Sequence, residues 1–532
     1  MVASLTEARK LGPATSEVRH PAKEPVLAQI ASFVDLFIWL IILKTFFTPI
    51  FQIPTGSMAQ TLFGEHAVHT CPNCSWEYPI GPERRRLPGG GEQTGLPSRI
   101  QCPNCRWMEE TTTASGGPLR LIPGDRIIVH GWPYDFGGAL GPQRWDVIVF
   151  KNPSAPDENY IKRLIGLPGE TIELIDGDAF VRRPGEQELR VARKTAVAQE
   201  SLWMPFHDQD FLPRSTSPGR DHPRWESVNA TGWDNLDTRI LSFNAPQHEA
   251  AIQFVTRGVS ESPACVIEDI YGYNPLYPLR EVTDVRVGAD VQFQQGDGFV
   301  EFAISKYQNI FYARLHADGR VTLERAERNS GQREVLGVPV QIARPTPGRA
   351  VRFSIGHADY QVVVAVDGKA VITTTPDQYD TNAEMARKRN TRFASPMIRI
   401  AAEKTQGTLA HVRVERDVFY RGDPDWSGVP ANVSEGHPLV LGNEYFPMGD
   451  NSPASLDGRY WRSESVGPHL LAARDKGQYT IGTVPADQMI GKAFLVYFPG
   501  MNPIELLGKG FYFQIGSVQI GLPDFGHVRW IH

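Results

Sequence analysis

The apolar residues of this chain follow two patterns. Residues 30–51 form one nearly continuous apolar run, whose length suits a helix crossing about 30 Å of hydrocarbon. Beyond it, apolar and polar residues mostly alternate in short stretches separated by glycine and proline, which is typical of strands joined by turns. The pattern predicts a mainly β body preceded by one N-terminal transmembrane helix.

The charges around the apolar run predict its orientation. Four basic residues precede it: Arg9, Lys10, Arg19 and Lys23. A cytoplasmic tail 1–29 and a body on the extracytoplasmic side of the cell membrane are therefore expected. Asp35 and Lys44 lie within the run and leave an interfacial amphipathic helix as the alternative. A cleaved secretory signal is disfavoured because the run begins only after a long polar stretch.

Length and charge narrow the class of protein. A chain of 532 residues with one anchor has room for three or four domains. A net charge of −6 argues against a nucleic-acid partner, because such proteins present basic surfaces.

The segment after the apolar run contains a candidate nucleophile, Ser57, in FQIPTGSMAQTL. A serine hydroxyl needs a base, which can be a lysine kept uncharged by burial. Lys162 fits this description, because a strand would place it on one face with Tyr160 and Leu164. The alternatives are a turn serine and a surface lysine whose stem covers a half-buried strand.

A third segment, residues 448–461, concentrates polar side chains where a loop is expected. It has the sequence MGDNSPASLDGRYW, and a turn-rich surface loop is its simplest interpretation. Its side chains could also support a catalytic site formed elsewhere.

Four sequence blocks in order carry a resemblance to a known family. They are FQIPTGSM (residues 51–58), GDRIIVH (124–130), YIKRLIGLPGE (160–170) and MGDNSPASLDGR (448–459). Together the blocks resemble the type I signal peptidases, membrane-bound serine proteases that remove signal peptides from exported precursors. The resemblance implies a signal-peptidase-type β catalytic core, no cofactor for catalysis, and signal peptides and membrane lipid as partners.

The resemblance also implies roles for individual residues. Ser57 corresponds to the nucleophile and Lys162 to the general base. Thr55 Oγ and the Ser57 backbone N–H correspond to the oxyanion hole. Ser455 falls where the family holds the lysine amine in place, and Met58 where it lines the substrate cleft.

The last block implies supporting roles. Asp457 and Arg459 match a structural pair beside the site, and Asp450 and Asn451 match the loop that supports it. The chain departs from the family pattern at Gln60, which replaces a frequent proline. It departs again at Ser452 and Pro453, which replace residues that are often charged, so an auxiliary ion pair is expected to be missing.

Two CPNC motifs lie between the first two blocks. They place Cys71, Cys74, Cys102 and Cys105 in two tight turns, an arrangement that resembles a zinc ribbon with one structural Zn²⁺. Two disulfides remain the alternative, since an exported domain lies in an oxidising compartment. The fifth cysteine, Cys265, is expected to be a buried free thiol.

The largest insertion, residues 198–421, is predicted to be a β-sandwich. Positions 285–293 and 362–366 alternate cleanly, and Asp318-Gly319 and Asp367-Gly368 supply hairpin turns. The insertion looks like a concanavalin/laminin-G type sandwich, a fold that can bind a glycan or a protein. Three tryptophans could form a binding platform or pack in the core: Trp203, Trp225 and Trp233.

The predicted order of parts is tail 1–29, transmembrane helix 30–51, catalytic core 52–68, zinc-ribbon-like insertion 69–112, core 113–197, sandwich insertion 198–421 and core 422–532. The predicted function is a membrane-bound signal peptidase with a Ser57/Lys162 dyad. Two alternatives are an inactive membrane-tethered binding protein that uses the sandwich and a self-cleaving Ser/Lys regulator.

Overall fold

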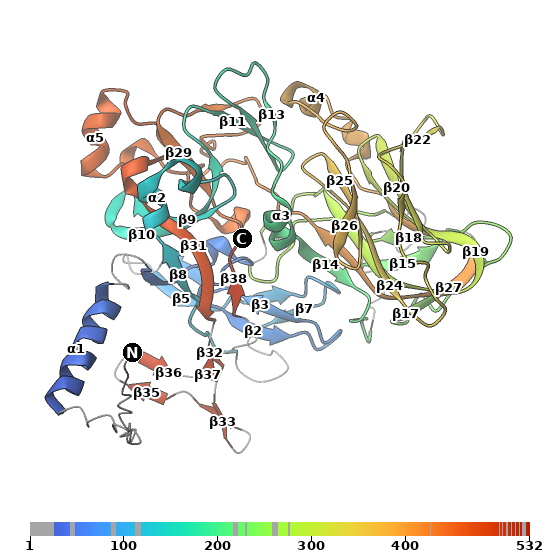
Figure 1. Ribbon diagram of the computed structural model, residues 1–532, viewed down its shortest axis with the longest axis horizontal. Helices are drawn as coiled ribbons and strands as arrows, with labels where there is room; N and C mark the ends of the chain where they lie inside the picture. Colours follow the sequence, from blue (N-terminus) through green and yellow to red (C-terminus); the bar gives the residue numbers. More distant parts are fainter. Residues whose placement is uncertain are drawn as a thin grey trace, which may run out of the picture. The chain divides into compact units, whose positions relative to one another are not determined.

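The computed structural model shows a mainly β protein (Figure 1). It describes residues 26–42, 48–86, 92–111, 119–215, 222–228, 231–257, 264–274, 277–425, 427–499, 501–502, 504–506, 509–511, 513–515, 518–520, 522–523 and 528–532. The chain divides into two compact units, Met1–Thr48 and Pro49–His532, which are described separately.

The first unit contains helix α1 (Val26–Ile42). Its large apolar side chains are exposed, including Phe33, Leu36 and Trp39. Within the residues that the structure describes, no helix is long and apolar enough to cross a membrane. The predicted transmembrane helix 30–51 is therefore unsupported, and its last two residues belong to a strand of the second unit. The tail 1–25 and residues 43–47 lie outside the described residues.

An eight-stranded antiparallel sheet forms the centre of the second unit. Its order is β1 (Ile50–Gln52), β8 (Arg126–His130), β31 (Met489–Phe498), β9 (Val147–Asn152), β10 (Ala155–Gly166), β29 (Glu444–Met448) and β30 (Val484–Pro485), with β38 (Arg529–Trp530) on β31. Alternate side chains of β8 and β9 are buried with residues near β1, which fixes one face of the sheet against an apolar cluster.

The register of this sheet brings the last block beside the lysine block. In β10, Lys162 lies opposite Ile148 of β9, and Arg163 lies opposite Met448 of β29. Met448 is the last residue of β29 and pairs with Arg163, so the loop that follows β29 begins beside the strand that carries Lys162. A second, four-stranded sheet runs in the order β13 (Arg190–Val191), β12 (Asp178–Arg182), β11 (Thr171–Ile175) and β28 (Leu439–Val440).

Three hairpins precede β8. They are β2 (Ala67–Thr70) with β3 (Glu77–Ile80), β4 (Glu83–Arg86) with β5 (Glu92–Gly95), and β6 (Arg99–Gln101) with β7 (Met108–Glu110). The turns of the first and third hairpins carry the cysteine pairs.

Residues 198–421 build a larger body of strands around β19 (Val285–Lys306) and β27 (Ile398–Arg416). The other strands are β14 (Met204–Asp208), β15 (Arg224–Ser227), β16 (Trp233–Asp234), β17 (Ile240–Ala245), β18 (Ala250–Val255), β20 (Asn309–His316), β21 (Arg320–Glu327), β22 (Arg333–Val335), β23 (Val340–Gln341), β24 (Val351–Ala358), β25 (Gln361–Val366) and β26 (Lys369–Thr373).

The two long strands each serve two layers. The first half of β19 pairs with β24, and the second half pairs with β20, with register shifts near Gly288 and Gly296 between them. Inward side chains of both halves share one apolar core. The predicted hairpins at 318–319 and 367–368 are present between β20 and β21 and between β25 and β26. Trp225 and Trp233 are buried in the core, so they pack and do not form a platform.

Four short α-helices, several 3-10 turns and several small hairpins complete the described elements. The helices beside α1 are α2 (Trp132–Phe136), α3 (Ala196–Leu202), α4 (Ala383–Arg387) and α5 (Pro468–Asp475). The hairpins are β32 (Met501–Asn502) with β37 (Leu522–Pro523), β33 (Ile504–Leu506) with β34 (Lys509–Phe511), and β35 (Phe513–Ile515) with β36 (Val518–Ile520).

Buried ion pairs join residues 198–421 to the central body. Lys306 of β19 donates to Asp178 of β12 at 3.2 Å and to Asp284 at 2.7 Å. Lys194, which precedes α3, donates to Asp417 at 2.7 Å. Removing one partner of a buried pair is costly, so these contacts fix the insertion against the four-stranded sheet.

Candidate active site

Ser57 and Lys162 meet in a buried contact. Ser57 lies in the 3-10 turn η2 (Gly56–Met58), shortly after edge strand β1, and Lys162 lies in β10. Lys162 Nζ donates a hydrogen bond to Ser57 Oγ at 2.7 Å. The two residues are 8% and 4% exposed, respectively, so bulk water does not compete with the contact.

The surroundings of Lys162 favour the uncharged amine. Burial lowers its pKa to about 8, because an ammonium loses its hydration there. Asp457 raises the pKa in part, and Arg459 opposes that effect. Nζ also donates to the Ile161 carbonyl at 2.9 Å. A lysine with this pKa can accept a proton near neutral pH.

The loop after β29, residues 449–460, holds the Ser57 turn by its backbone. The Asn451 N–H donates to the Ser57 carbonyl at 3.0 Å, and Asn451 Nδ2 donates to the Gly56 carbonyl at 3.0 Å. Gly449 makes this approach possible, because a Cβ there would lie 2.4 Å from the Ser57 carbonyl oxygen. We call residues 449–460 the support loop.

A fully buried ion pair stiffens the support loop. Arg459 donates to both carboxylate oxygens of Asp457, at 2.8 and 2.7 Å, and both side chains are 0% exposed. Asp457 also accepts from the Gly449 N–H at 2.8 Å. Burial alone would raise the pKa of Asp457, but the Arg459 guanidinium holds it below its usual range. The pair predicted from the sequence is thus in contact.

A second buried pair was not predicted. Arg163 donates to both oxygens of Asp450, at 2.7 and 2.8 Å, and Thr61 donates to Asp450 at 2.6 Å. Arg163 follows Lys162 directly in β10, so the strand places it on the opposite face. A charged residue inside an apolar strand was the available signal, because a buried charge needs a counter-charge.

Three predicted site residues occupy different surroundings. Thr55 is exposed next to the Ser57 turn, and Ser455 is buried beside Gly449. Among the described residues, Lys162 Nζ bonds only to Ser57 and Ile161, so no hydrogen bond joins it to Ser455. Met58 is 0% exposed in the apolar cluster under the sheet, where it packs instead of lining an open surface. The cleft role of Met58 stays a prediction.

The departures from the family pattern have contacts of their own. Gln60 donates to the Trp203 carbonyl at 2.7 Å and so ties the Ser57 segment to the start of the insertion. Ser452 Oγ accepts hydrogen bonds from the Arg421 N–H and from Arg459, both at 2.8 Å. Beside Ser452, Arg421 pairs with Asp269 at 2.6 Å, so an ion pair does lie next to the support loop.

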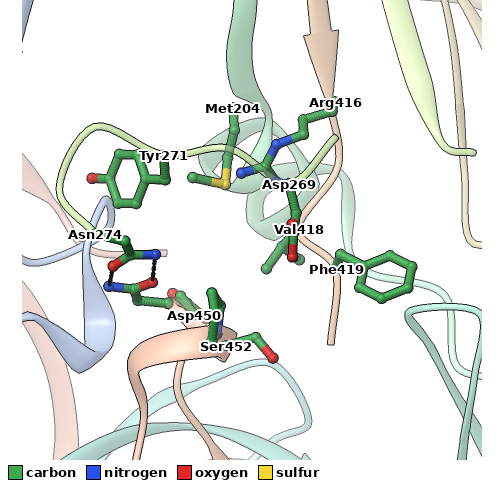
Figure 2. A pocket seen from close by; sticks show the side chains of 11 residues that line it. Met204, Asp269, Tyr271, Asn274, Arg416, Val418, Phe419, Asp450 and Ser452 are labelled. Carbon is green, nitrogen blue, oxygen red and sulfur yellow. Dashed lines mark hydrogen bonds between the residues drawn. The ribbon is translucent and has the colours of Figure 1, made fainter. Parts of the chain in front are cut away.

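Cavities surround the support loop. One cavity, of about 580 Å³, is lined by Tyr277, Pro278, Arg280, Arg421, Asp423, Pro424, Asp425, Ser427, Pro453, Ala454, Ser455, Leu456 and Tyr460. A small cavity of about 10 Å³ is lined by residues of the loop, among them Asp450 and Ser452, and by residues of the insertion, among them Asp269, Asn274 and Arg416 (Figure 2). Both cavities therefore have walls from residues 198–421.

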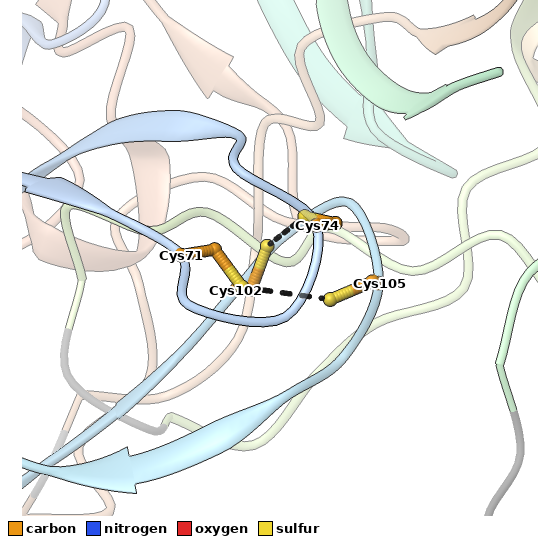
Figure 3. Close-up of side chains that lie close together, drawn as sticks. All are labelled: Cys71, Cys74, Cys102 and Cys105. Carbon is orange, nitrogen blue, oxygen red and sulfur yellow. Dashed lines mark hydrogen bonds between the residues drawn. The ribbon is translucent and has the colours of Figure 1, made fainter. Parts of the chain in front are cut away.

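The four cysteines of the CPNC motifs converge (Figure 3). Their sulfur atoms lie within 4.8 Å of one another, with Cys71 to Cys105 at 3.7 Å and Cys74 to Cys102 at 3.6 Å. A disulfide would need about 2.05 Å. Four thiolates around one Zn²⁺, each about 2.3 Å from the ion, would stand about 3.8 Å apart. The spacing fits a tetrahedral ion.

The two cysteine turns have the same backbone. The Ser75 N–H donates to the Cys71 carbonyl and the Arg106 N–H to the Cys102 carbonyl, at 2.8 and 3.0 Å. Ser75 and Arg106 both have positive φ, 65° and 64°. Equivalent turns aim their thiols at one point, as a shared ligand requires.

Arg106 tests whether the cluster suits a metal. Its guanidinium lies 4.2 Å from the centre of the Phe206 ring, and its Nη1 and Nη2 are buried without a hydrogen-bond partner among the described residues. A buried cation needs nearby negative charge. Four thiolates around a divalent cation carry a net charge of about −2 and would supply it. Cys265 is a half-buried free thiol against the sandwich core.

Comparison with known proteins identifies similarity to signal peptidases. The family model described as "Signal peptidase, peptidase S26" matches residues 113–210 and 347–498. These ranges include Lys162 and the support loop, and Ser57 precedes them. The match supports a serine protease of the signal peptidase type.

The curated relatives that this chain resembles include proteins named signal peptidase I. The protein of Pseudomonas aeruginosa is 31% identical over 195 residues, 35% of this chain and 50% of the relative. The protein of Pseudomonas fluorescens is 29% identical over 195 residues, which are 35% of this chain and 51% of the relative. The protein of Rickettsia felis is 50% identical over 64 residues, which are 12% of this chain and 23% of the relative. The chain spans about half the length, or less, of the curated relatives it matches.

Solved structures resemble part of the chain. Carbohydrate binding module CBM66 from Bacillus subtilis is 14% identical and covers 36% of this chain and 94% of its own, with a TM-score of 0.23. The laminarinase catalytic domain from Thermotoga petrophila RKU-1 is 12% identical, and the match covers 40% of this chain and 98% of that domain, with a TM-score of 0.27. Similarity at this level identifies neither a ligand nor an activity.

Proposed function

We propose that this protein is a membrane-bound serine endopeptidase that removes signal peptides from exported precursor proteins with a Ser57/Lys162 dyad. The observation that carries the proposal is the buried 2.7 Å contact between Lys162 Nζ and Ser57 Oγ. The pKa of Lys162, lowered by burial to about 8, gives this contact its chemistry. The similarity to signal peptidase I supplies the substrate class.

The proposed reaction uses the dyad in two steps. Uncharged Lys162 takes the proton of Ser57 Oγ as the oxygen attacks the scissile carbonyl, and it returns a proton to the leaving amine. The Ser57 N–H and Thr55 Oγ donate to the developing oxyanion. The exposed position of Thr55 supports this role, since a substrate at the surface can reach this residue. Water then releases the acyl group by the same base.

The edge strand β1 supports an extended substrate. β1 is the end strand of the eight-stranded sheet, and Ser57 follows it closely. A polypeptide in extended conformation can add to such an edge through its backbone, and shallow pockets then select small side chains before the cleaved bond. The peptide carbonyl would reach Ser57 from that edge.

Helix α1 supports attachment to the membrane. Its exposed apolar side chains include Phe33, Leu36, Phe37 and Trp39. An exposed apolar surface of this kind is stable against lipid and unfavourable in water. We place the catalytic unit on the extracytoplasmic side, where exported precursors emerge.

Precursor cleavage by the full chain in detergent tests the proposed function. The wild type should release a signal peptide from a precursor, and Ser57→Ala should lower the rate by at least about 10³-fold, because the nucleophile is gone. The products are identified by mass spectrometry, which locates the cleaved bond. A wild type without endopeptidase activity would instead indicate a tethered binding protein.

We also propose that Cys71, Cys74, Cys102 and Cys105 hold one structural Zn²⁺. Four cysteine ligands leave no open position, so the ion would stabilise the fold without acting on substrate. The purified protein should contain about one zinc per chain by elemental analysis. Cys102→Ser should lower both the zinc content and the unfolding temperature, because metal binding is coupled to folding.

Cys265→Ser is the matched control for this zinc prediction. Cys265 lies outside the cluster, so its replacement should leave the zinc content unchanged. Four half-cystines by mass spectrometry, with no zinc, would establish disulfides in place of the metal.

A further inference from the structure

One segment of the insertion reaches the Ser57 turn. Residues 269–274 lie in the connection between β18 and β19, and Tyr273 lies directly on the turn. A Cβ on Gly56 would lie 1.9 Å from Tyr273 Cε1, so the ring fills the space that this glycine leaves. Tyr273 OH donates to the Glu65 carbonyl at 2.8 Å. The segment is therefore packed against the nucleophile's own backbone.

The cysteine hairpins hold the same segment from another side. The Gly81 N–H, just after β3, donates to the Tyr273 carbonyl at 2.8 Å. A Cβ on Gly272 would lie 2.4 Å from the ring of Tyr78 in β3. Close backbone approach on two sides leaves the 269–274 segment little freedom to move.

Asn274 forms a reciprocal pair with Asn451 of the support loop. Asn274 Nδ2 donates to Asn451 Oδ1 at 2.8 Å, and Asn451 Nδ2 donates to Asn274 Oδ1 at 2.7 Å (Figure 2). The other hydrogen of Asn451 Nδ2 goes to the Gly56 carbonyl. Both ends of the Asn451 amide are thus engaged, and the two hydrogen bonds to Asn274 restrain the rotation of the side chain whose Nδ2 contacts Gly56.

We propose that Asn274 is a positioning residue that aims the oxyanion-binding N–H of Ser57. This inference rests on the proposed function, since it assigns a role within the same site. The Gly56 carbonyl and the Ser57 N–H belong to one planar peptide unit and point in opposite directions. Fixing the carbonyl with Asn451 Nδ2 therefore fixes the direction of the N–H.

Loss of Asn274 would release the Asn451 amide. Without the two hydrogen bonds from Asn274, the Asn451 side chain can rotate and lose the contact of its Nδ2 with the Gly56 carbonyl. The Gly56 carbonyl would then keep only the Ala59 N–H of its own turn, at 3.0 Å, and the Ser57 N–H would be held less firmly in the direction that the oxyanion needs. An interaction that strengthens only in the transition state affects kcat more than KM. The insertion is thereby a working part of the active site.

The experiment measures kcat, KM and the pH profile of precursor cleavage for four variants of the full chain. Asn274→Ala should lower kcat about tenfold, less than the 10²–10³-fold loss for removing an oxyanion donor outright. KM should stay within about twofold, because the interaction is specific to the transition state. The pH midpoint should stay unchanged, because Lys162 keeps its surroundings.

A double-mutant comparison separates positioning from general stability. Asn451→Ala should lower kcat at least as far as Asn274→Ala, and the double variant should fall no further than Asn451→Ala alone, because Asn274 acts through Asn451. The control Asn244→Ala removes an exposed asparagine of β17 in the same insertion and should match the wild type.

The outcomes are distinct. Unchanged kcat in Asn274→Ala, or losses that multiply in the double variant, would overturn the positioning role while the proposed function stands. A shifted pH midpoint would assign Asn274 to the base and also overturn it. A wild type that cleaves no precursor would overturn both proposals. A variant that unfolds is replaced by Asn274→Asp, which keeps an acceptor for Asn451 Nδ2 and should restore part of kcat.

Discussion

The substitution Lys162→Met is expected to lower the rate of precursor cleavage by about 10³-fold, within the 10²–10⁴-fold range for removing a general base. Methionine has a similar length and suits an apolar environment, but it accepts no proton. The unfolding temperature should be equal to or above that of the wild type, because the variant no longer buries an amine. Turnover and thermal unfolding of the same preparation measure both effects.

The pH profile of the wild type is part of the same prediction. Because only the uncharged amine can act as base in the proposed mechanism, turnover should rise with pH through about 8, the lowered pKa of Lys162. At pH 7 roughly a tenth of the enzyme would hold the amine uncharged. The matched control is Lys151→Met on the neighbouring strand β9, where the side chain is exposed and turnover should not change. Full activity in Lys162→Met would refute the dyad.

Asp457→Ala should destabilise the catalytic unit by about 3–5 kcal/mol, the usual cost of leaving a buried charge without its partner. Arg459 would keep its charge with 0% exposure, and the Gly449 N–H would lose its acceptor. Thermal unfolding monitored by circular dichroism measures the loss. Turnover should fall as well, because the support loop holds the Ser57 turn.

The pH dependence and a control distinguish this effect from surface electrostatics. Because the pKa of Asp457 is lowered, its contribution is present above the usual carboxylate range and is lost as pH falls below it. Glu186→Ala removes an exposed pair with Arg183, whose side chains are 40% and 62% exposed, and should leave the unfolding temperature unchanged. Equal effects of the two substitutions would contradict the prediction.

The sequence predicted the local features of the molecule well. Strand alternation along 285–293 and the Asp-Gly turns depend on neighbouring residues, so they are visible in the chain and present in the structure. The contact between Ser57 and Lys162 was inferred from block order and resemblance, and the two side chains do meet.

Long-range polar contacts could not be predicted from local pattern. Asp450 and Arg163 are 287 residues apart, and Asn274 and Asn451 are 177 apart. The sequence around each of these residues does not indicate which residue it contacts, because connecting segments of any length can bring two side chains together. The extent of the N-terminal helix was also wrong, because the apolar run continues into Ile50 and Phe51, which join a sheet.

The residues of the site lie far apart in the sequence, so the ribosome synthesises them at different times. The Ser57 turn is held by Asn451, whose side chain bonds to Gly56 across 395 residues. At roughly 5–20 residues per second, a ribosome needs about 20–80 s to make the intervening chain. Ser57 is synthesised first, and during this interval the support loop that orients it has not yet been made. In the proposed mechanism, the Ser57/Lys162 dyad therefore becomes competent only late in translation, after the whole insertion has been made.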